Sequence, residues 1–373
     1  MTDPHPTTPM TEALSDLRQG IDSIDDQILA LLAQRGRLVQ KVGELKQESD
    51  RPFFVPAREV AIMERLKGMD RGPFPWESVE RVFREIISAS IALERPLEVA
   101  FLGPATTFTH QAALKQFGGS VQYRPVRTIP EVFREVETAC ADYGVVPVEN
   151  AFEGMVIHTL DSFSRSPLKI VAEINLPIAQ YLLGKGDLAG VKKIYSHYQP
   201  FLQCNSWLNN TLPEIQRIEV ASTTEAAARA AQEEGAAAIA PLQSAEVYGL
   251  DVLAEHIEDH PDNTTRFLVI GRHTTPPAGG GRDKTSLLLS APDRPGALFD
   301  MLAPFNNRGL NLTRIESRPT RQQMWQYHFF VDLIGHQGEA TVRAALAELE
   351  TMGVMIKVLG SYPMALRGEG GEG

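Results

Sequence analysis

The sequence has 373 residues, which at roughly 100–200 residues per domain corresponds to two to four domains. Its 47 acidic and 36 basic residues give a net charge of −11, which argues against a general nucleic-acid binder, because such a protein needs a basic field. No apolar run approaches the roughly 20 residues that cross a bilayer, and the first residues lack a basic segment followed by an apolar stretch.

The two cysteines, Cys140 and Cys204, provide neither a disulfide framework nor the ligand spacing of a zinc site. This cysteine usage is typical of a reducing compartment. We therefore expect a cytoplasmic protein that carries no metal or redox cofactor and has no nucleic-acid or membrane partner.

The pattern changes twice along the chain. A Pro/Thr-rich tail, expected to be disordered, precedes a helical pattern from about Thr11 to Glu94. Short apolar runs such as Gly144–Val148 and Ala236–Ala240 then alternate with helical stretches, which predicts an α/β domain with a largely parallel sheet. A Pro/Gly-rich linker leads to one β-α-β-β-α-β unit. The predicted segments are a tail at residues 1–9, a helical domain at 10–95, an α/β domain at 97–271, a linker at 272–283, a C-terminal unit at 284–366 and a solvated tail at Gly368–Gly373.

The first helix carries a heptad seam. Nine of its ten members are apolar and one is an arginine: Leu14, Leu17, Ile21, Ile24, Ile28, Leu31, Arg35, Leu38, Val42 and Leu45. A guanidinium in a seam costs free energy unless it is paired or faces an anion. Arg18 and Lys46 lie beside the seam. Two interpretations are open: Arg35 sets the register of a coiled coil, or these cations bind an anionic ligand.

If these cations bind one anionic ligand, the distance between Arg18 and Arg35 matters. Arg18 and Arg35 are 17 residues apart, or about 25 Å along a helix, farther than a small metabolite reaches. If both contact one ligand, Arg18 must come from a second, antiparallel copy of the helix. The spacing therefore predicts a dimer under that interpretation.

Two further helical segments complete a recognisable set. Ser90 and Glu94 lie four residues apart on a helix expected at about Trp76–Leu93, and Arg58-Glu59 opens a short helix after Pro56. The order of these residues resembles the all-helical chorismate mutases over about residues 10–95. The residues that carry the resemblance are Arg18, Arg35, Lys46, Arg58, Glu59, Ser90 and Glu94.

That resemblance implies an intertwined helical dimer and a role for most of these residues. Arg18 of the partner chain, Arg35 and Arg58 would hold the two carboxylates of chorismate. Glu59 would take a ring hydroxyl, and Lys46 with Glu94 would hydrogen-bond the ether oxygen. Such a rearrangement needs orientation and charge stabilisation rather than a nucleophile.

Two positions depart from the mutase pattern. Many members have glutamine in place of Glu94, so this carboxyl is expected to act protonated, and mutase activity should fall as pH rises. Val55 stands where some relatives place an acidic residue that contacts the ring hydroxyl, so one contact is expected to be missing.

Polar motifs in the middle domain lie at the ends of apolar runs, where α/β sites usually form. Glu149-Asn150 ends the strand Gly144–Asn150, Ser196–Cys204 opens a helix, and Asn263–Phe267 precedes a strand at Leu268–Gly271. Taken singly, these residues are better explained by structural roles. Asn150 and Thr265 would cap turns, and Gln203 would lie on a helix surface.

Together the motifs resemble the prephenate dehydratases over about residues 97–271, a family with a two-lobed α/β fold. Prephenate would lose carbon dioxide and water to give phenylpyruvate. The resemblance makes Thr265 the donor to the departing hydroxyl and Arg266 a substrate-binding residue. Glu149 or water would assist, because a threonine hydroxyl is a weak general acid. The remaining orienting residues would be Asn150, Ser196 and Gln203.

Two residues of the middle domain depart from the dehydratase pattern. The family usually has glycine in place of Thr106, so a strained turn is expected there. It usually has serine or threonine in place of Ala151, so a hydroxyl is missing.

The C-terminal unit combines a ferredoxin-like pattern with two motifs. Its strands are expected near 285–291, 312–319, 325–334 and 354–361, and its helices near 296–308 and 339–352. Gly296 stands at a strand-to-helix turn, where backbone N–H groups can receive a carboxylate. The unit resembles the ACT regulatory domain, which implies that phenylalanine binds between paired domains and inhibits the enzyme by feedback. The alternative is a dimerisation domain without a ligand. The implied effector residues are Gly296, Ala297, Leu298, Asn311, Glu316, Ser317 and Arg318.

The expectation is thus a multidomain chain in which an all-α chorismate mutase, a two-lobed α/β prephenate dehydratase and a ferredoxin-like ACT domain follow one another. Its ligands would be chorismate, prephenate and phenylalanine, and it would form a homodimer or a higher homo-oligomer. The alternatives are an enzyme that keeps only one activity or uses arogenate, and a non-catalytic sensor of aromatic metabolites.

Overall fold

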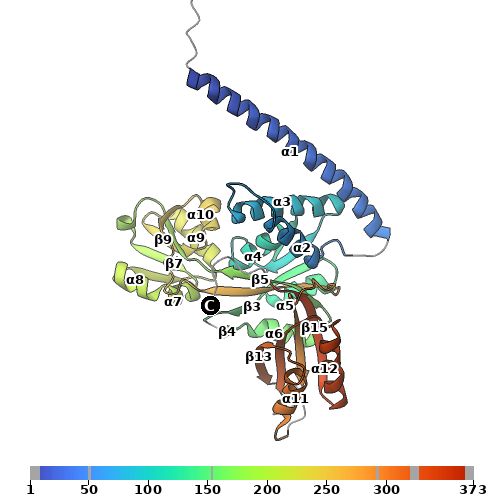
Figure 1. The fold of residues 1–373 in the computed structure, drawn as a ribbon. Coiled ribbons are helices and arrows are strands. Elements are labelled where there is room, and N and C mark those ends of the chain that lie inside the picture. Colours follow the sequence, from blue (N-terminus) through green and yellow to red (C-terminus); the bar gives the residue numbers. More distant parts are fainter. Residues whose placement is uncertain (1–8, 49–51, 153, 291–293, 320–326, 366–373) are drawn as a thin grey trace, which may run out of the picture.

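The computed structural model describes residues 9–48, 52–152, 154–290, 294–319 and 327–365. Within them the chain forms a helical segment, a two-lobed α/β segment and a smaller α/β unit that follow one another along the sequence (Figure 1). Residues 1–8 of the predicted first tail and the whole predicted tail Gly368–Gly373 lie outside the described residues, as do the ends of two strands predicted near 285–291 and 325–334.

One long helix dominates the N-terminal segment. Helix α1 (Pro9–Glu48) projects away from the body of the molecule, whereas α2 (Pro56–Lys67) and α3 (Trp76–Glu94) lie on it (Figure 1). All nine apolar members of the predicted seam are exposed, from 43% for Val42 to 67% for Leu17. A stripe of this length normally faces another helix, so α1 presents a ready packing surface.

The other two helices share a core with the α/β segment. Phe54, Met63 and Trp76 pack in one cluster with Phe117 and Tyr143 of the next segment. The aromatic rings are in direct contact, with 4.7 Å between the centroids of Phe54 and Phe117. The helical segment is therefore anchored through α2 and α3, while most of α1 extends beyond this core.

The first lobe is built on a sheet in the order β2-β1-β3-β11-β5, with β4 paired to β3. Its strands are β1 (Glu98–Leu102), β2 (Gln122–Val126), β3 (Tyr143–Asn150), β4 (Gly154–Met155), β5 (Lys169–Pro177) and β11 (Thr264–Gly271). Its helices are α4 (Phe108–Phe117), α5 (Ile129–Glu137) and α6 (Ile157–Arg165). Thr107 and Thr128 cap α4 and α5 by accepting backbone N–H groups.

The second lobe has a sheet in the order β10-β6-β9-β7-β8. Its strands are β6 (Tyr181–Gly184), β7 (Lys193–Ser196), β8 (Gln216–Glu219), β9 (Ala236–Ala240) and β10 (Asp251–Ala254). Its helices are η1 (Leu188–Gly190), α7 (Tyr198–Gln203), α8 (Asn205–Thr211), α9 (Thr223–Gln232) and α10 (Gln243–Tyr248). Strand β9 consists of alanine and isoleucine and is completely buried, as its apolar run predicts.

Both sheets are mixed rather than largely parallel, which corrects the expectation from the sequence. In the first lobe β1 runs parallel to β2 and β3, but β11 is antiparallel to β3 and β5. The physical reason is the path of the chain. Strand β11 returns to the first lobe from the completed second lobe, and it therefore runs antiparallel to β3.

The predicted linker is packed rather than loose. Asp283 is completely buried and accepts hydrogen bonds from the backbone N–H groups of Ala278 and Gly279. The ring of His336 lies 3.0 Å from the carbonyl oxygen of Thr275. These contacts fix how the C-terminal unit meets the middle segment.

The C-terminal unit has the predicted order of strands and helices. Its elements are β12 (Asp283–Ser290), α11 (Ala297–Asn306), β13 (Leu312–Pro319), β14 (Tyr327–Ile334), α12 (Ala340–Thr351) and β15 (Met355–Pro363). The sheet order is β13-β14-β12-β15. One face packs on α11 and α12 through residues such as Leu287 and Leu289. The opposite face joins the core of the first lobe through Leu288, Phe330 and Leu359.

Candidate functional sites

Four of the predicted mutase residues meet where α1 crosses α3. Lys46 Nζ donates to Glu94 Oε2 at 2.7 Å and to the carbonyl oxygen of Phe53 at 3.1 Å. Arg35 donates to the hydroxyl of Ser90. Burial lowers the pKa of Arg35, and the nearby carboxylate of Glu94 opposes this effect. The predicted cationic seam residue is therefore partly buried and paired.

Gly43 allows this crossing. A Cβ atom at this position would lie 3.1 Å from the Cα and 3.2 Å from the Cβ of Glu94, tighter than ordinary van der Waals contact. The glycine thus lets α1 approach α3 at the level of the Lys46–Glu94 pair.

The other three predicted mutase residues have different surroundings. Arg18 is exposed on the projecting part of α1, about 25 Å along the helix from Arg35. Arg58 is exposed at the start of α2. Glu59 is buried, and its carboxylate accepts from Arg84 at 3.1 Å and from the Gln116 amide at 3.2 Å.

The contact of Glu59 with a ring hydroxyl stays a prediction, and in one chain its carboxylate is held by Arg84 and Gln116 instead. Its side chain lines a cavity of about 200 Å³ between α2, α3 and the first lobe, together with Arg84, Lys115 and Glu173. Burial raises the pKa of Glu59 to about 7, against the opposing effects of Arg84 and Gln116.

The second candidate site is a cleft of about 530 Å³ between the two lobes of the middle segment. Asn150 and Thr265 line it from the first lobe, and Gln203 lines it from the second. Asn150 Nδ2 donates to Thr265 Oγ1 and to Asn263 Oδ1, both at 2.9 Å. Gln203 Oε1 accepts from the Gln180 amide at 2.9 Å.

These contacts fix the orientation of the Asn150 amide. Its Oδ1 accepts from the backbone N–H of Phe152 at 3.0 Å, so the NH₂ group must be the part that faces Thr265. An amide NH₂ only donates, and the Thr265 oxygen is therefore the acceptor in that bond. The Thr265 hydroxyl proton consequently points elsewhere, which suits a group that donates into the cleft.

Three predicted dehydratase residues do not line the cleft, and these expectations are corrected. Thr264 to Arg266 belong to β11 rather than to a loop before it, so Thr265 and Arg266 point to opposite faces of the sheet. Glu149, next to Asn150 in β3, likewise points to the other face and is paired with Arg314. The buried Ser196 hydroxyl donates to the carbonyl oxygen of Ile239 at 2.9 Å.

Sequence reasoning missed part of the cleft wall. Gln180 and the first turn of α9, with Ser222 and Thr223, line it from the second lobe. The available signal was the capping pattern Ser222 to Glu225, which marks a helix start: the Ser222 hydroxyl accepts from the backbone N–H of Glu225 at 3.1 Å.

The two departures from the dehydratase pattern have structural counterparts. Thr106 has φ +66°, the left-handed conformation that favours glycine, as the expected strained turn requires. Its hydroxyl lies 3.1 Å from that of Thr224, which links the two lobes. Ala151 is exposed, and its backbone N–H donates to the carbonyl oxygen of Thr264.

The predicted effector residues lie at two ends of the C-terminal sheet. Gly296, with φ +80°, precedes α11, and Leu298 is 42% exposed in its first turn. The strand register places Arg318 level with Ser290, the last residue of β12, but Leu312 level with Thr285, near its start. The effector residues at or near the α11 end are Gly296, Ala297, Leu298, Glu316, Ser317 and Arg318, and Asn311 lies at the other end.

The part of the chain that the structure describes shows neither a metal centre nor a membrane-spanning helix. Among the described residues, no group of three or more His, Cys, Asp or Glu side chains is arranged to hold a metal ion. Over the same ranges no helix has the length and apolar character needed to span a membrane.

Comparison with known proteins identifies all three segments. Family models described as chorismate mutase type II, prephenate dehydratase and ACT domain match residues 17–95, 99–275 and 285–351. The prephenate dehydratase of Arthrobacter aurescens, solved in complex with L-Phe, superposes with a TM-score of 0.65 at 38% identity, covering 72% of this chain and 90% of that chain.

Two curated relatives match almost end to end. The bifunctional chorismate mutase/prephenate dehydratase of Aquifex aeolicus is 49% identical over 360 residues, which covers 95% of this chain and 99% of the relative. That of Pseudomonas aeruginosa is 45% identical over 364 residues, with the same coverage. Both reactions, from chorismate to prephenate and from prephenate to phenylpyruvate, are thus assigned to one polypeptide, and the ACT domain fits feedback regulation by phenylalanine. The chain belongs to the family of bifunctional chorismate mutase/prephenate dehydratases.

Proposed function

We propose that the mutase reaction takes place beside Arg35, Lys46, Ser90 and Glu94, and that Arg18 of a second copy completes this site. The Lys46–Glu94 contact of 2.7 Å and the Arg35–Ser90 contact support the proposal, because they gather two cations on one partly buried surface. A guanidinium can hold a carboxylate, and an ammonium can hydrogen-bond the ether oxygen, while the bond from that oxygen to the ring carbon breaks and a new carbon–carbon bond forms. Arg58, exposed at the start of α2, supplies a further cation.

The dimer in this proposal rests on the exposed seam of α1. A second α1 running antiparallel would cover the nine apolar side chains and bring its Arg18 toward Arg35. We therefore propose a homodimer as the smallest form with mutase activity. We also propose that the protein is located in the cytoplasm. The domain boundaries proposed for each protomer remain 10–95, 97–271 and 284–366.

Prephenate dehydration is proposed to take place in the cleft between the two lobes. Thr265, whose oxygen accepts the Asn150 amide at 2.9 Å, donates its proton to the departing hydroxyl and regains a proton from solvent. Asn150 and Gln203 orient the substrate from opposite lobes. Loss of carbon dioxide supplies the electron pair that expels the hydroxyl as water, so no nucleophile is required of the protein.

Phenylalanine is the proposed effector, bound where two ACT domains meet. One protomer offers the turn at Gly296 to Leu298 and its partner offers Asn311. In one chain these groups lie at opposite ends of β13, an eight-residue strand about 25 Å long. An amino acid cannot bridge that length, whereas two sheets side by side bring the groups together.

A coupled assay tests the whole proposal. The full chain is supplied with chorismate and then with prephenate, and phenylpyruvate is followed with and without millimolar phenylalanine. We expect product from both substrates and less of it when phenylalanine is present. Product from prephenate alone removes the mutase assignment, no turnover of either substrate indicates a sensor, and turnover that ignores phenylalanine removes the effector.

A further inference from the structure

The two strands that carry Asn150 and Thr265 contact the ACT domain through their other face. In the antiparallel pair β3–β11, Thr265 lies opposite Asn150 and the next pair along is Arg266 opposite Glu149. Because strand neighbours alternate between faces, the first pair faces the cleft and the second faces the ACT domain. Thr265 and Asn150, which line the cleft, are therefore adjacent in sequence to Arg266 and Glu149, which face the ACT domain.

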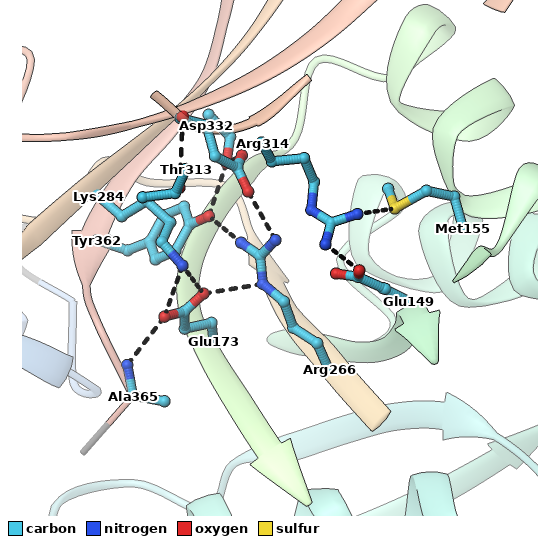
Figure 2. Close-up of polar contacts among 11 residues, drawn as sticks. Glu149, Met155, Glu173, Arg266, Lys284, Thr313, Arg314, Asp332, Tyr362 and Ala365 are labelled. Atoms are coloured by element: carbon cyan, nitrogen blue, oxygen red, sulfur yellow. Dashed lines mark hydrogen bonds and ion pairs between the residues drawn. The ribbon is translucent and has the colours of Figure 1, made fainter. Parts of the chain in front are cut away.

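Arg266 is bound by side chains on three strands. Its Nε donates to Glu173 Oε2 at 2.9 Å, its Nη1 to Asp332 Oδ2 at 2.6 Å and its Nη2 to the Tyr362 hydroxyl at 2.9 Å (Figure 2). Asp332 and Tyr362 belong to the ACT strands β14 and β15. Lys284, on β12, contacts both oxygens of Glu173.

The side chains of this network are buried, which restricts their movement. The side chains of Arg266 and Asp332 are 12% and 10% exposed. Burial alone would lower the pKa of Arg266, but Tyr362, Asp332 and Glu173 raise it above its usual value. A buried guanidinium with its donors in a fixed fork follows its partners when they move, since leaving a buried charge unpaired is strongly unfavourable.

Glu149 is held in the same way from the neighbouring ACT strand. Arg314, on β13, donates to its carboxylate and also to the sulfur of Met155 (Figure 2). Arg266 on β11 and Glu149 on β3 thus form a cross-strand pair, and ACT side chains bind both of its members.

The ladder itself is irregular at this point. The pairing of β11 with β3 shifts register between Arg266 and Phe267. Such bulges loosen local pairing and re-aim side chains, and here the bulge directly follows the segment that carries Thr265. On its other edge β11 stays regularly paired with β5 through Thr265 and Arg266, so the bulge frees this segment from β3 alone, and a displacement of Arg266 is passed to its neighbour Thr265.

We propose that Arg266 and Glu149 are positioning residues that couple the ACT domain to the Thr265–Asn150 pair, through Asp332 and Tyr362 on one strand and Arg314 on the other. When phenylalanine rearranges the ACT sheet, Arg266 shifts with its partners and turns the Thr265 hydroxyl out of line with the departing group. This inference rests on the proposed effector, and it assigns the route by which occupancy of the ACT domain reaches the cleft.

The test uses ACT-side variants of the full chain. Asp332→Asn and Tyr362→Phe keep shape but remove a charge or a hydroxyl that Arg266 contacts, and neither residue lies in the cleft. Lys357→Gln is the matched control, because Lys357 also joins the ACT domain to the first lobe, at the carbonyl oxygens of Phe163 and Ser166 (2.8 and 2.7 Å). Phenylalanine binding is measured by calorimetry, and the mutase rate reports intact folding.

We expect both ACT-side variants to bind phenylalanine within about threefold of the wild-type Kd. The degree of inhibition is the dehydratase kcat/KM without phenylalanine divided by kcat/KM with saturating phenylalanine. In both ACT-side variants this ratio should nevertheless be about tenfold smaller than in the wild type, or equal to one if inhibition is lost, which is within the usual range of allosteric coupling. The control variant should keep the wild-type ratio.

Three outcomes overturn the inference. Wild-type ratios in both ACT-side variants remove the coupling route alone, and so does an equal loss of coupling in Lys357→Gln. A wild-type dehydratase that binds phenylalanine but ignores it, or does not bind it, removes the proposed effector as well.

Discussion

The two candidate catalytic sites differ in how much of each a single chain supplies. The dehydratase cleft lies between two lobes of one protomer, and its polar residues are fixed by contacts such as Asn150–Thr265 at 2.9 Å. The mutase group lies at the base of a helix whose apolar seam is exposed, and Arg18 is about 25 Å along that helix from Arg35. One chain therefore holds a complete cleft but, under the proposal, half of each mutase site.

This difference follows from the kind of element that carries each site. A two-lobed α/β domain buries its own strands and creates a concave surface where the lobes meet. A single long helix creates neither a core nor a cavity, so its functional side chains need a second helix to enclose a ligand. The dehydratase should accordingly be insensitive to changes that affect the pairing of α1.

The sharpest test separates the two sites within one chain. Lys46→Met should lower mutase kcat/KM by about 10³-fold, because it removes the cation proposed for the ether oxygen. Thr265→Val should lower dehydratase kcat/KM by about 10²–10⁴-fold, because it removes the proposed proton donor. Each variant should keep the other activity, as measured by separate assays with chorismate and prephenate. Loss of both activities in either variant would contradict the separation of the sites.

Subunit mixing tests whether the mutase site is shared. Arg18→Gln alone should lower mutase kcat/KM by about 10²-fold, or roughly 3 kcal/mol, the loss of one charge-assisted contact. Mixed with Lys46→Met chains after dissociation, it should recover about a quarter of the wild-type rate, since half of the dimers are mixed and each has one intact site.

No recovery on mixing would mean that Arg18 acts within its own chain or not at all. The dehydratase rate of the same mixtures should remain at the wild-type value throughout, and it serves as the internal standard for protein concentration.

A smaller effect is expected from Gly43→Ala. The added Cβ would lie 3.1 Å from Glu94 Cα, so α3 must shift by a few tenths of an ångström and carry Glu94 with it. Misplacement of this size should lower mutase kcat by about fivefold to tenfold, although alanine is the better helix former by about 1 kcal/mol.

Gly36→Ala is the matched control for that substitution. Its Cβ would meet only the Leu93 side chain, at an ordinary 3.7 Å. An equal loss of activity in both variants would point to a change in α1 itself rather than to the crossing with Glu94.

Much of the fold was predictable because the apolar periodicity is strong. The α1 seam, the buried β9 and the order of the ACT elements all follow from spacing alone, and the structure has them within a few residues. The mixed sheets were not predictable in the same way, because the direction of β11 depends on the return of the chain from the second lobe.

The candidate sites show where sequence reasoning stops. Lys46 and Glu94 lie on different helices, and the structure brings them into contact at one helix crossing, as the resemblance implies. Arg266 was misplaced because β11 begins at Thr264 rather than Leu268, and a strand start that is early by a few residues decides which face each side chain takes. Ser196 was misplaced because its hydroxyl meets the carbonyl oxygen of Ile239, a contact that no spacing reveals.

Glu59 is buried where the helical segment packs against the first lobe. A folded-state pKa of about 7, raised by burial from an ordinary 4.5, means that the folded chain binds this proton more tightly than the unfolded chain does. The contribution to stability is therefore present at low pH and is lost as pH rises from about 4.5 through 7.

Glu59→Gln removes that titration, so its stability relative to wild type should rise by about 2–3 kcal/mol between pH 5 and pH 8, as measured by urea unfolding. The matched control is Glu80→Gln, since Glu80 lies 3.7 Å from the same Arg84 but is more exposed. A pH-independent difference for Glu59→Gln would show that Glu59 stays ionised beside Arg84, and the side chain would then be a structural ion pair between the helical segment and the first lobe.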